Sequence, residues 1–393
     1  MKDDHRFMNE LFRIVNGALR LDIERVRNYT EYLAQKLEKD GNKNAADRLR
    51  KMLEENDHQL RPTETSFSRA IPVDTDSRFP LIERVNVRAS EEASVILSQE
   101  QWDVVKEFVS IAKSYGQLDA KDAAGSICML MYGPPGTGKS HLARHVAAEL
   151  DLDLYVARLD GLISSFLGST SKNIRALFDF AAKTPCVLFL DEFDAIAKLR
   201  GDHQELGELK RVVNSFIQNL DSLGSQSIVL AATNHKELLD AAVWRRFSYR
   251  VALEYPTSEL REELCRQYLG GFSFADRDIE ILVDLSEGFS GSDIFEVSRR
   301  LKRRSITTKE EPGLNEAFQI LQNLSMGEGE ERRFVSVLRG KGANEISVSL
   351  HERNEKLYSS AAIAELLSVS KSTAYRMTQK KAGQDGRQQE AGS

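Results

Sequence analysis

The chain has 393 residues, 41% of them hydrophobic and 29% charged, which is typical of two or three folded domains and excludes a disordered or fibrous protein. Its formal net charge is −6, so the chain has no overall positive potential that would attract it to nucleic acid or to a membrane surface. Any contact with DNA must therefore be local. Three scattered cysteines have no metal-ligand spacing, and no apolar run approaches the length of a membrane span. The chain also begins without an apolar signal segment, so we expect a cytoplasmic protein without membrane contact.

Residues 1–56 are predicted to form an N-terminal helical hairpin. Apolar residues recur at helical spacing from Ile23 to Leu37, and the pattern resumes after Gly41. Such a hairpin either packs as an appendage or docks a partner or substrate, and the sequence favours neither. Residues 57–95 carry three prolines among Ser, Thr and Asp and are predicted to be a linker.

Residues 96–256 are predicted to form the large domain of the chain. The tetrapeptide from Ser98 to Gln101 has the pattern of a capping box and starts a helix. Five short apolar runs then alternate with helical patterns, which predicts an α/β fold with a five-stranded parallel sheet covered on both faces. The runs are 127–132, 153–157, 186–190, 227–231 and 249–253. Helical patterns over residues 257–330 predict a small helical lid.

A phosphate-binding loop of the form G-x-x-x-x-G-K-[ST] lies between the first apolar run and a helix that starts at His141. In such a loop Lys139 reaches the β- and γ-phosphates of ATP, and the Ser140 hydroxyl ligates Mg²⁺. The sequence therefore predicts ATP and Mg²⁺ as cofactors. The predicted nucleotide-binding residues of the loop are Gly133, Pro134, Gly136, Thr137, Gly138, Lys139, Ser140 and His141.

Two further strand ends carry polar residues. Asp191 and Glu192 follow the apolar run 186–190, at the edge of an α/β sheet where ligands bind. We expect Asp191 to hold Mg²⁺ beside the nucleotide and Glu192 to polarise the attacking water. Asn234 follows the run 227–231 and is placed to bond the γ-phosphate or that water. Alone, each would be read as a solvated rim or a turn residue.

From about residue 96 to 304 the chain resembles the AAA+ ATPases of the clade that contains spastin and katanin. The resemblance rests on five motifs in family order, namely GPPGTGKS, VLFLDEFD, AATN, LLDAAVWRRF and GFSGSDI. It implies that Asn234 is the first sensor, and that Arg245 and Arg246 are arginine fingers acting on a neighbouring subunit. It also implies a hexameric ring.

The same resemblance implies two further sites. Gly291 and Ser292 occupy the second-sensor position, where this clade carries small residues. Phe166, Leu167 and Gly168 match the first pore loop, in which a ring of aromatic side chains grips a threaded polypeptide. Family members often have Glu after that glycine, and this chain has a serine. A second pore loop is expected over 198–208.

Residues 331–381 are predicted to form a C-terminal helical segment that resembles a helix-turn-helix, followed by a loose tail at 382–393. On its second helix Lys371, Ser372, Thr373 and Arg376 would face outward. These side chains are suited to DNA phosphates and bases, but folds of this kind also dock proteins, and both interpretations stay open.

The leading hypothesis is an ATP-hydrolysing ring motor that unfolds or remodels a protein client by threading it through a central pore. The client or a partner protease, nuclease or toxin would be recruited by the N-terminal hairpin. The alternative is a DNA-linked ATPase of the helicase-loader or transposition type, recruited through the C-terminal segment. A nucleotide-gated scaffold is a third hypothesis, and Glu192 argues against it because a pure binder needs no catalytic acid.

Overall fold

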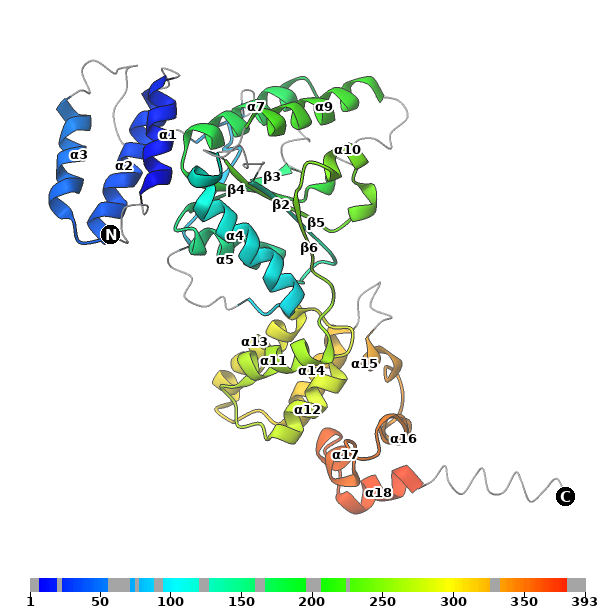
Figure 1. Cartoon of the computed structure of the whole chain (residues 1–393). Helices are drawn as coiled ribbons and strands as arrows, with labels where there is room; N and C mark the ends of the chain where they lie inside the picture. The colour runs from blue at the N-terminus through cyan, green and yellow to red at the C-terminus, as the bar shows by residue number, and fades with distance from the viewer. Residues whose placement is uncertain are drawn as a thin grey trace. The chain divides into compact units, whose positions relative to one another are not determined.

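The computed structural model describes residues 7–19, 23–55, 71–74, 78–87, 95–119, 127–159, 167–195, 206–223, 227–325 and 333–379. The chain divides into two compact units (Figure 1). The first contains Met1–Pro134 and Lys139–Leu253, and the second contains Pro135–Gly138 and Glu254–Ser393. Within the described ranges, no helix is long and apolar enough to cross a membrane.

The described residues of the first unit form a six-stranded sheet in the order β1-β3-β4-β5-β2-β6. Its strands are β1 (Glu83–Val85), β2 (Ile127–Tyr132), β3 (Asp153–Arg158), β4 (Cys186–Asp191), β5 (Ile228–Thr233) and β6 (Tyr249–Ala252). Neighbouring strands from β3 through β6 pair in parallel, as expected, whereas β1 pairs antiparallel with β3. The predicted linker over 57–95 is therefore wrong at β1, which is too short to show a period of two.

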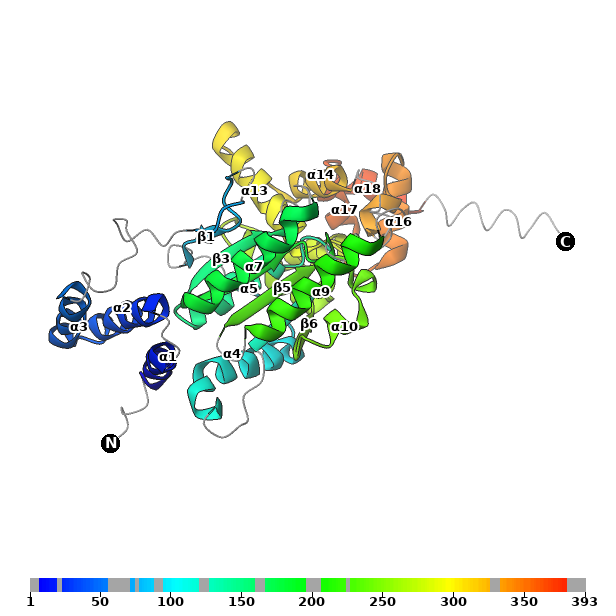
Figure 2. The same ribbon diagram turned by 90° about the horizontal axis from the view of Figure 1, so that it is seen from above.

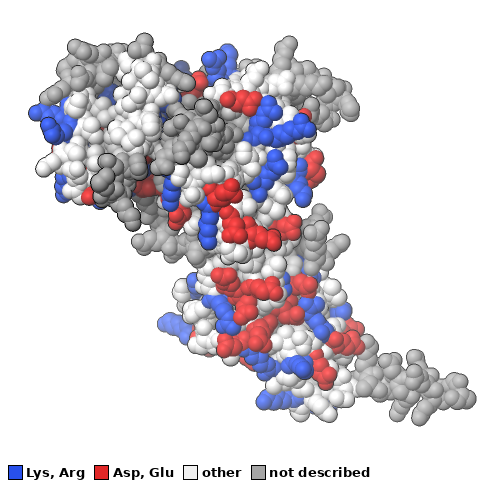
Figure 3. All heavy atoms as spheres, in the orientation of Figure 1, with Lys and Arg blue, Asp and Glu red and all other residues white. Residues whose placement is uncertain are grey.

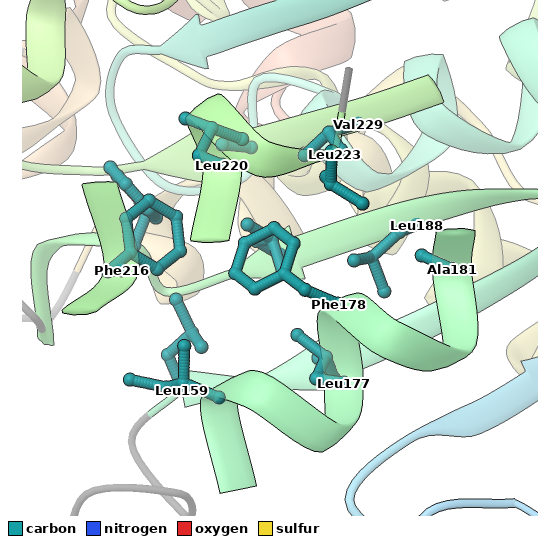
Figure 4. Packing of buried hydrophobic residues seen from close by; sticks show 14 of the residues in the cluster. Leu159, Leu177, Phe178, Ala181, Leu188, Phe216, Leu220, Leu223 and Val229 are labelled. Carbon is teal, nitrogen blue, oxygen red and sulfur yellow. The ribbon is translucent and has the colours of Figure 1, made fainter. Parts of the chain in front are cut away.

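Helices cover both faces of this sheet because its strands are apolar on both sides. Along β4, Leu188 and Leu190 face one core and Val187 and Phe189 face the other. Helices α7 (Leu167–Lys183) and α9 (Leu206–Ser222) cover the first core, as Figure 2 shows from above, and Figure 4 shows Phe178 of α7 packed among its neighbours. Helices α4 (Gln99–Asp119) and α5 (Lys139–Glu149) cover the second.

The capping box predicted for α4 is confirmed. The Gln101 amide donates to Ser98 Oγ at 3.3 Å, and the Ser98 amide donates to Gln101 Oε1 at 2.9 Å. Two backbone donors at the start of the helix are thereby satisfied. The apolar stripe that follows is buried, with Val105 and Phe108 at most 1% exposed, so α4 is held on the sheet by that face.

The described part of residues 1–56 contains three helices rather than the two of a hairpin. They are α1 (Met8–Leu19), α2 (Ile23–Lys39) and α3 (Lys43–Glu55). The break between α1 and α2 contains no Gly or Pro, so the sequence pattern did not reveal it. The Tyr32 hydroxyl of α2 donates to the carbonyl oxygen of Asp151 at 2.8 Å, and Lys39 pairs with the Asp151 carboxylate at 2.7 Å.

The second unit is helical. It contains α11 (Ser258–Leu269), α12 (Asp276–Leu285), α13 (Gly291–Thr308), α14 (Leu314–Leu324), α15 (Phe334–Val337), α16 (Ala343–Arg353), α17 (Ser360–Leu366) and α18 (Lys371–Gln379). The C-terminal helices pack on the earlier ones through polar contacts. Arg353 of α16 pairs with Asp284 of α12 at 2.7 Å, and the Tyr358 hydroxyl donates to the same carboxylate at 2.5 Å. Helices before and after residue 330 thus form one unit.

Phe193 offers a test of the core beneath the sheet's carboxyl edge. It is 0% exposed, and its ring centroid lies 5.1 Å from that of Phe216 and 5.6 Å from that of Phe247. Phe193→Ala should lower the free energy of unfolding of the first unit by about 3–5 kcal/mol, because it leaves a cavity among aromatic rings. Both tryptophans of the chain, Trp102 and Trp244, lie in this unit, so urea unfolding followed by tryptophan fluorescence measures it.

The matched control is Phe12→Ala on α1, whose side chain is 42% exposed. Removal of an exposed ring should change the same free energy by no more than about 0.5 kcal/mol. Equal losses in the two variants would contradict the proposed packing.

Candidate functional site

The polar residues singled out in the sequence lie at one edge of the sheet. Parallel pairing sets Tyr132, the last residue of β2, opposite Thr233, the last residue of β5. On the other side of β5, Leu190 of β4 lies opposite Ala231. The ends of β2, β4 and β5 therefore bring the glycine loop, Asp191 and Asn234 to the edge where α/β sheets bind ligands.

The loop after β2 requires glycine for two different reasons. Gly133 has φ of +145°, its amide donates to Thr233 O at 3.2 Å, and an added Cβ would lie 1.9 Å from Leu253 O. No side chain fits that approach. Gly136 and Gly138 have φ of +77° and +99°, which L side chains rarely adopt. An added Cβ at Gly138 meets nothing within 4 Å, so the loop has open space beside that residue.

Lys139 is the first residue of α5 and is only 8% exposed. Its Nζ donates to Gly133 O at 2.8 Å and to Pro134 O at 2.7 Å. Burial lowers the pKa of Lys139 to about 8, against the opposing effect of the Asp191 and Asp194 carboxylates. The loop thus holds a cation at the N-terminus of a helix, where backbone N–H groups favour an anion.

Asp191 and Glu192 are placed differently from each other. Asp191 ends β4, and its Oδ1 accepts from the Glu192 amide at 3.0 Å. Glu192 is exposed and has φ of +54°, a left-handed conformation that is uncommon for a residue with a side chain. Strain of this kind is often retained at functional sites, so Glu192 stands out structurally as well as in the motif.

Asp194 and Thr233 belong to this edge, and the sequence analysis did not assign either a role. Asp194 is 4% exposed, and its Oδ1 accepts from Thr233 Oγ1 at 3.1 Å. Thr233 Oγ1 in turn accepts from the His235 amide at 3.0 Å, which fixes the turn that carries the exposed Asn234. The sequence could have indicated both residues, because Asp194 lies within the motif VLFLDEFD and Thr233 within AATN.

In the second unit, the residues predicted to occupy the second-sensor position contact Gly136 of the same unit. The Ser292 amide at the start of α13 donates to Gly136 O at 3.0 Å. An added Cβ at Gly291 would lie 3.7 Å from the same oxygen. The structure therefore brings Gly291 and Ser292 against Gly136.

Arg245 and Arg246 follow the short helix α10 (Ala241–Trp244), whose first turn is capped by the Asp240 carboxylate accepting from Ala242 N at 2.8 Å. Arg246 forms two bonds of 3.0 Å with the Asp221 carboxylate of the same chain. Arg245 is exposed. The two arginines predicted as fingers thus differ among the described residues, since Arg246 is bound by a carboxylate of its own chain and Arg245 is exposed.

Other predicted sites are described only in part. Phe166 and most of the expected second pore loop lie outside the described residues, and Leu167 and Gly168 form the first turn of α7. His141 lies in the first turn of α5, and the pKa of its imidazole is lowered by burial and by Arg144.

On α18, Lys371 and Arg376 are exposed, as expected for side chains that face outward. Ser370 Oγ accepts from the Thr373 amide at 3.2 Å, so Ser370 caps the start of α18. The hydroxyls of Ser372 and Thr373 lie 3.0 and 2.8 Å from the same Ser370 Oγ. Ser372 is exposed and Thr373 is half-buried, and both hydroxyls also take part in the cap.

The sequence motifs imply only two protein ligands for Mg²⁺, Ser140 and Asp191. Among the described residues there is no cluster of three or more His, Cys, Asp or Glu side chains that would form a dedicated metal cage. Mg²⁺ prefers one or two protein oxygens together with substrate phosphates and water, and the exposed Ser140 hydroxyl and the Asp191 carboxylate fit that requirement.

These features define a P-loop nucleotide site, and comparison with known proteins gives its class. Residues 129–255 match the family described as ATPase family associated with various cellular activities (AAA). An AAA family ATPase of Sinorhizobium fredii, y4kL, is 37% identical over 240 residues, covering 60% of this chain and 71% of that protein. The chain belongs to the AAA family of ATPases, and it is an enzyme that hydrolyses ATP.

Two further relatives are similar over a smaller share of their length. Vacuolar protein sorting-associated protein 4 of Dictyostelium discoideum is 36% identical over 172 residues, 42% of this chain and 38% of that protein. ATP-dependent zinc metalloprotease FtsH 2 of Bdellovibrio bacteriovorus is 34% identical over 219 residues, 53% of this chain and 35% of that protein. The chain thus spans well under half the length of these two relatives.

Burial of Lys139 generates a prediction on the pH dependence of ATP binding. A bound phosphate chain favours the charged ammonium, so binding should raise the lowered pKa of Lys139. Above about pH 8 the free protein has lost this proton, and ATP binding should take it up, so affinity should fall by up to about tenfold per pH unit.

Calorimetry checks this in two buffers that differ in ionisation enthalpy. At about pH 9 the binding heats should differ by an amount that reports proton uptake, and at about pH 6.5 the contribution of Lys139 should vanish because it is already protonated. Equal proton uptake at the two pH values would contradict the assignment.

Proposed function

We propose that this ATPase is a ring-forming motor that remodels or unfolds a protein client by threading it through a central pore. The observation that carries the proposal is the exposed Arg245, which directly follows a capped helix and is adjacent to an arginine held by Asp221. An exposed guanidinium at that position is suited to a phosphate group on a second copy of the chain. The similarity to an ATP-dependent metalloprotease, whose name couples ATP to proteolysis, supports a protein client.

In the proposed reaction each residue has one role. Lys139 and the loop amides hold the β- and γ-phosphates, and Ser140 with Asp191 holds Mg²⁺. When bound, Mg²⁺ neutralises charge on the phosphates. Glu192 orients and polarises the attacking water, and Asn234 bonds that water or the γ-phosphate. Arg245 and Arg246 of the neighbouring subunit stabilise the charge that develops in the transition state.

A partner or client would be recruited through the N-terminal helices. Large apolar side chains spaced along α1 are exposed, namely Leu11 at 44%, Phe12 at 42%, Val15 at 53% and Leu19 at 81%. Residues three and four apart lie on the same side of a helix, so these side chains form one apolar stripe. A stripe of this kind favours docking of a partner over simple packing.

The alternative of a DNA-linked ATPase receives no support from the relatives described above. On the face drawn in Figure 3, Lys and Arg are interspersed with Asp and Glu rather than gathered in a single-sign field. We therefore propose the C-terminal helices as a protein-docking element. A cytoplasmic location remains a prediction from the sequence.

Catalysis in trans is testable with two inactive variants. Arg245→Ala and Arg246→Ala should each bind ATP normally and hydrolyse it slowly, with a loss on the order of 10³-fold for the more important arginine. Glu192→Gln should also bind ATP without hydrolysing it. A mixture of the arginine variant with Glu192→Gln should regain activity, because a mixed interface contains one intact arginine and one intact glutamate.

The measurement is the steady-state ATPase rate of each variant alone and of the mixture, at equal total protein. A mixture no more active than its components would argue against trans action. Wild-type activity that is independent of protein concentration, with only monomers in saturating ATP, would argue against a ring.

Threading is tested at Phe166, which belongs to the segment between β3 and α7. Phe166→Ala should keep ATP hydrolysis, because the phosphate site lies on other segments, and should lose the apolar grip on a client. Phe166→Tyr should retain most of the remodelling, since the aromatic surface is kept. The paired measurement is ATPase rate and loss of fluorescence from a fluorescent protein that carries an unstructured tail. Unfolding by Phe166→Ala at the wild-type rate would contradict threading.

A further inference from the structure

One carboxylate near the start of α13 is an acceptor for three donors. Asp293 Oδ2 accepts from the Ser290 amide at 2.9 Å, from Ser290 Oγ at 2.7 Å and from Arg333 Nη2 at 2.7 Å. Ser290 Oγ accepts in return from the Asp293 amide at 3.2 Å, which completes a capping box. The geometry of this helix start therefore depends on Asp293.

Arg333 directly precedes α15, forty residues further along the chain from Asp293, and is almost completely buried. Its side chain is 9% exposed, and its guanidinium lies 4.3 Å from the centre of the Phe289 ring. It also donates to the Leu324 carbonyl oxygen. A buried charge is retained only where it is paired and hydrogen-bonded, and here the paired charge is Asp293.

On its other side the same helix start supports the glycine loop. Besides the bond from the Ser292 amide to Gly136 O, an added Cβ at Gly136 would lie 2.5 Å from Ser290 Oγ. Ser290 therefore fills the space directly beside Gly136. Any change in the orientation of the Ser290 side chain must move Gly136 or break this contact.

We propose that Arg333 is a positioning residue for ATP binding, acting through Asp293 and Ser290 on Gly136 of the phosphate-binding loop. Arg333 holds the Asp293 carboxylate, the carboxylate orients the Ser290 hydroxyl, and Ser290 with Ser292 fixes the conformation of Gly136. The inference rests on the proposed role of the loop in binding phosphates. Asp191 and Glu192 take no part in the contacts that lead from Arg333 to Gly136. Loss of Arg333 should therefore weaken ATP binding rather than slow the hydrolytic step.

Arg353 of the same unit provides a matched control. It pairs with Asp284 at 2.7 Å and with Glu287, and its guanidinium lies 3.8 Å from the centre of the Phe334 ring. It therefore resembles Arg333 in having carboxylate partners and a stacked aromatic ring. None of those contacts involves Asp293, Ser290 or Gly136.

The experiment measures KM for ATP, kcat and the melting temperature of the full chain for Arg333→Met and Arg353→Met. Both variants should melt at a lower temperature, because each leaves a carboxylate without its cation. Arg333→Met should raise KM by at least about fivefold with little change in kcat, and Arg353→Met should leave KM unchanged. A purely structural role for Arg333 would lower the active fraction, and so apparent kcat, without a change in KM.

Two further variants sharpen the test. Arg333→Lys keeps the charge but not the planar fork, so its KM should lie between those of the wild type and Arg333→Met. The double variant Arg333→Met with Asp293→Asn should have a KM no higher than the worse single variant, because both changes break one pathway. Additive effects, or a wild-type KM in Arg333→Met, would overturn the proposal.

The variant Lys139→Ala shows whether a negative result contradicts only the inference about Arg333 or also the proposed phosphate site. If Lys139→Ala binds ATP as well as the wild type, the loop is not the phosphate site and the proposed function fails with it. If Lys139→Ala loses ATP binding while Arg333→Met is normal, only the inference about Arg333 is wrong.

Discussion

The site depends on a Lys139 side chain that is buried and yet must carry a positive charge to bind phosphates. The groups around it stabilise that charge. Two loop carbonyl oxygens accept from Nζ, and the Asp191 and Asp194 carboxylates oppose the effect of burial on the pKa. The first of these carbonyls belongs to Gly133, which lies directly against Leu253 O, and the carboxylates are present because β4 ends at the same edge as β2. A phosphate chain would replace neutral oxygens with charged ones around an ammonium that is already in place.

Much of the large domain could be predicted from its sequence, because buried parallel strands form apolar runs that alternate with amphipathic helices. The five parallel strands lie within a residue or two of the predicted runs. Sequence reasoning failed where the determining contacts are distant in the chain. Strand β1 exists because Glu83–Val85 pairs with Val156–Leu154, and three residues carry no detectable alternation. The division between α1 and α2 likewise has no Gly or Pro to mark it.

At the candidate site, the sequence motifs identified the polar residues at the strand ends. The structure adds the hydrogen bonds and ion pairs that hold such residues in place. Asp194 and Thr233 bond each other across β4 and β5, a relation that spacing alone does not reveal. The unequal positions of Arg245 and Arg246 depend on Asp221, which precedes Arg246 by 25 residues. Arg333 is a further example of a pair that sequence patterns do not reveal, since nothing in its position along the chain indicates that Asp293 is its partner. Long-range pairing of polar groups is decided by the completed fold rather than by local pattern.

The short outer strands of the sheet have a consequence for how the protein avoids self-association. A long, flat edge strand exposes unpaired backbone groups that can recruit the same segment of another chain into a fibril. Among the residues that the structure describes, the outermost strands are β1 with three residues and β6 with four, and β1 runs antiparallel against β3. The long apolar strands β2, β4 and β5 are each flanked on both sides. A chain proposed to assemble with its own copies in one geometry thus offers little template for the aggregates that would compete with that assembly.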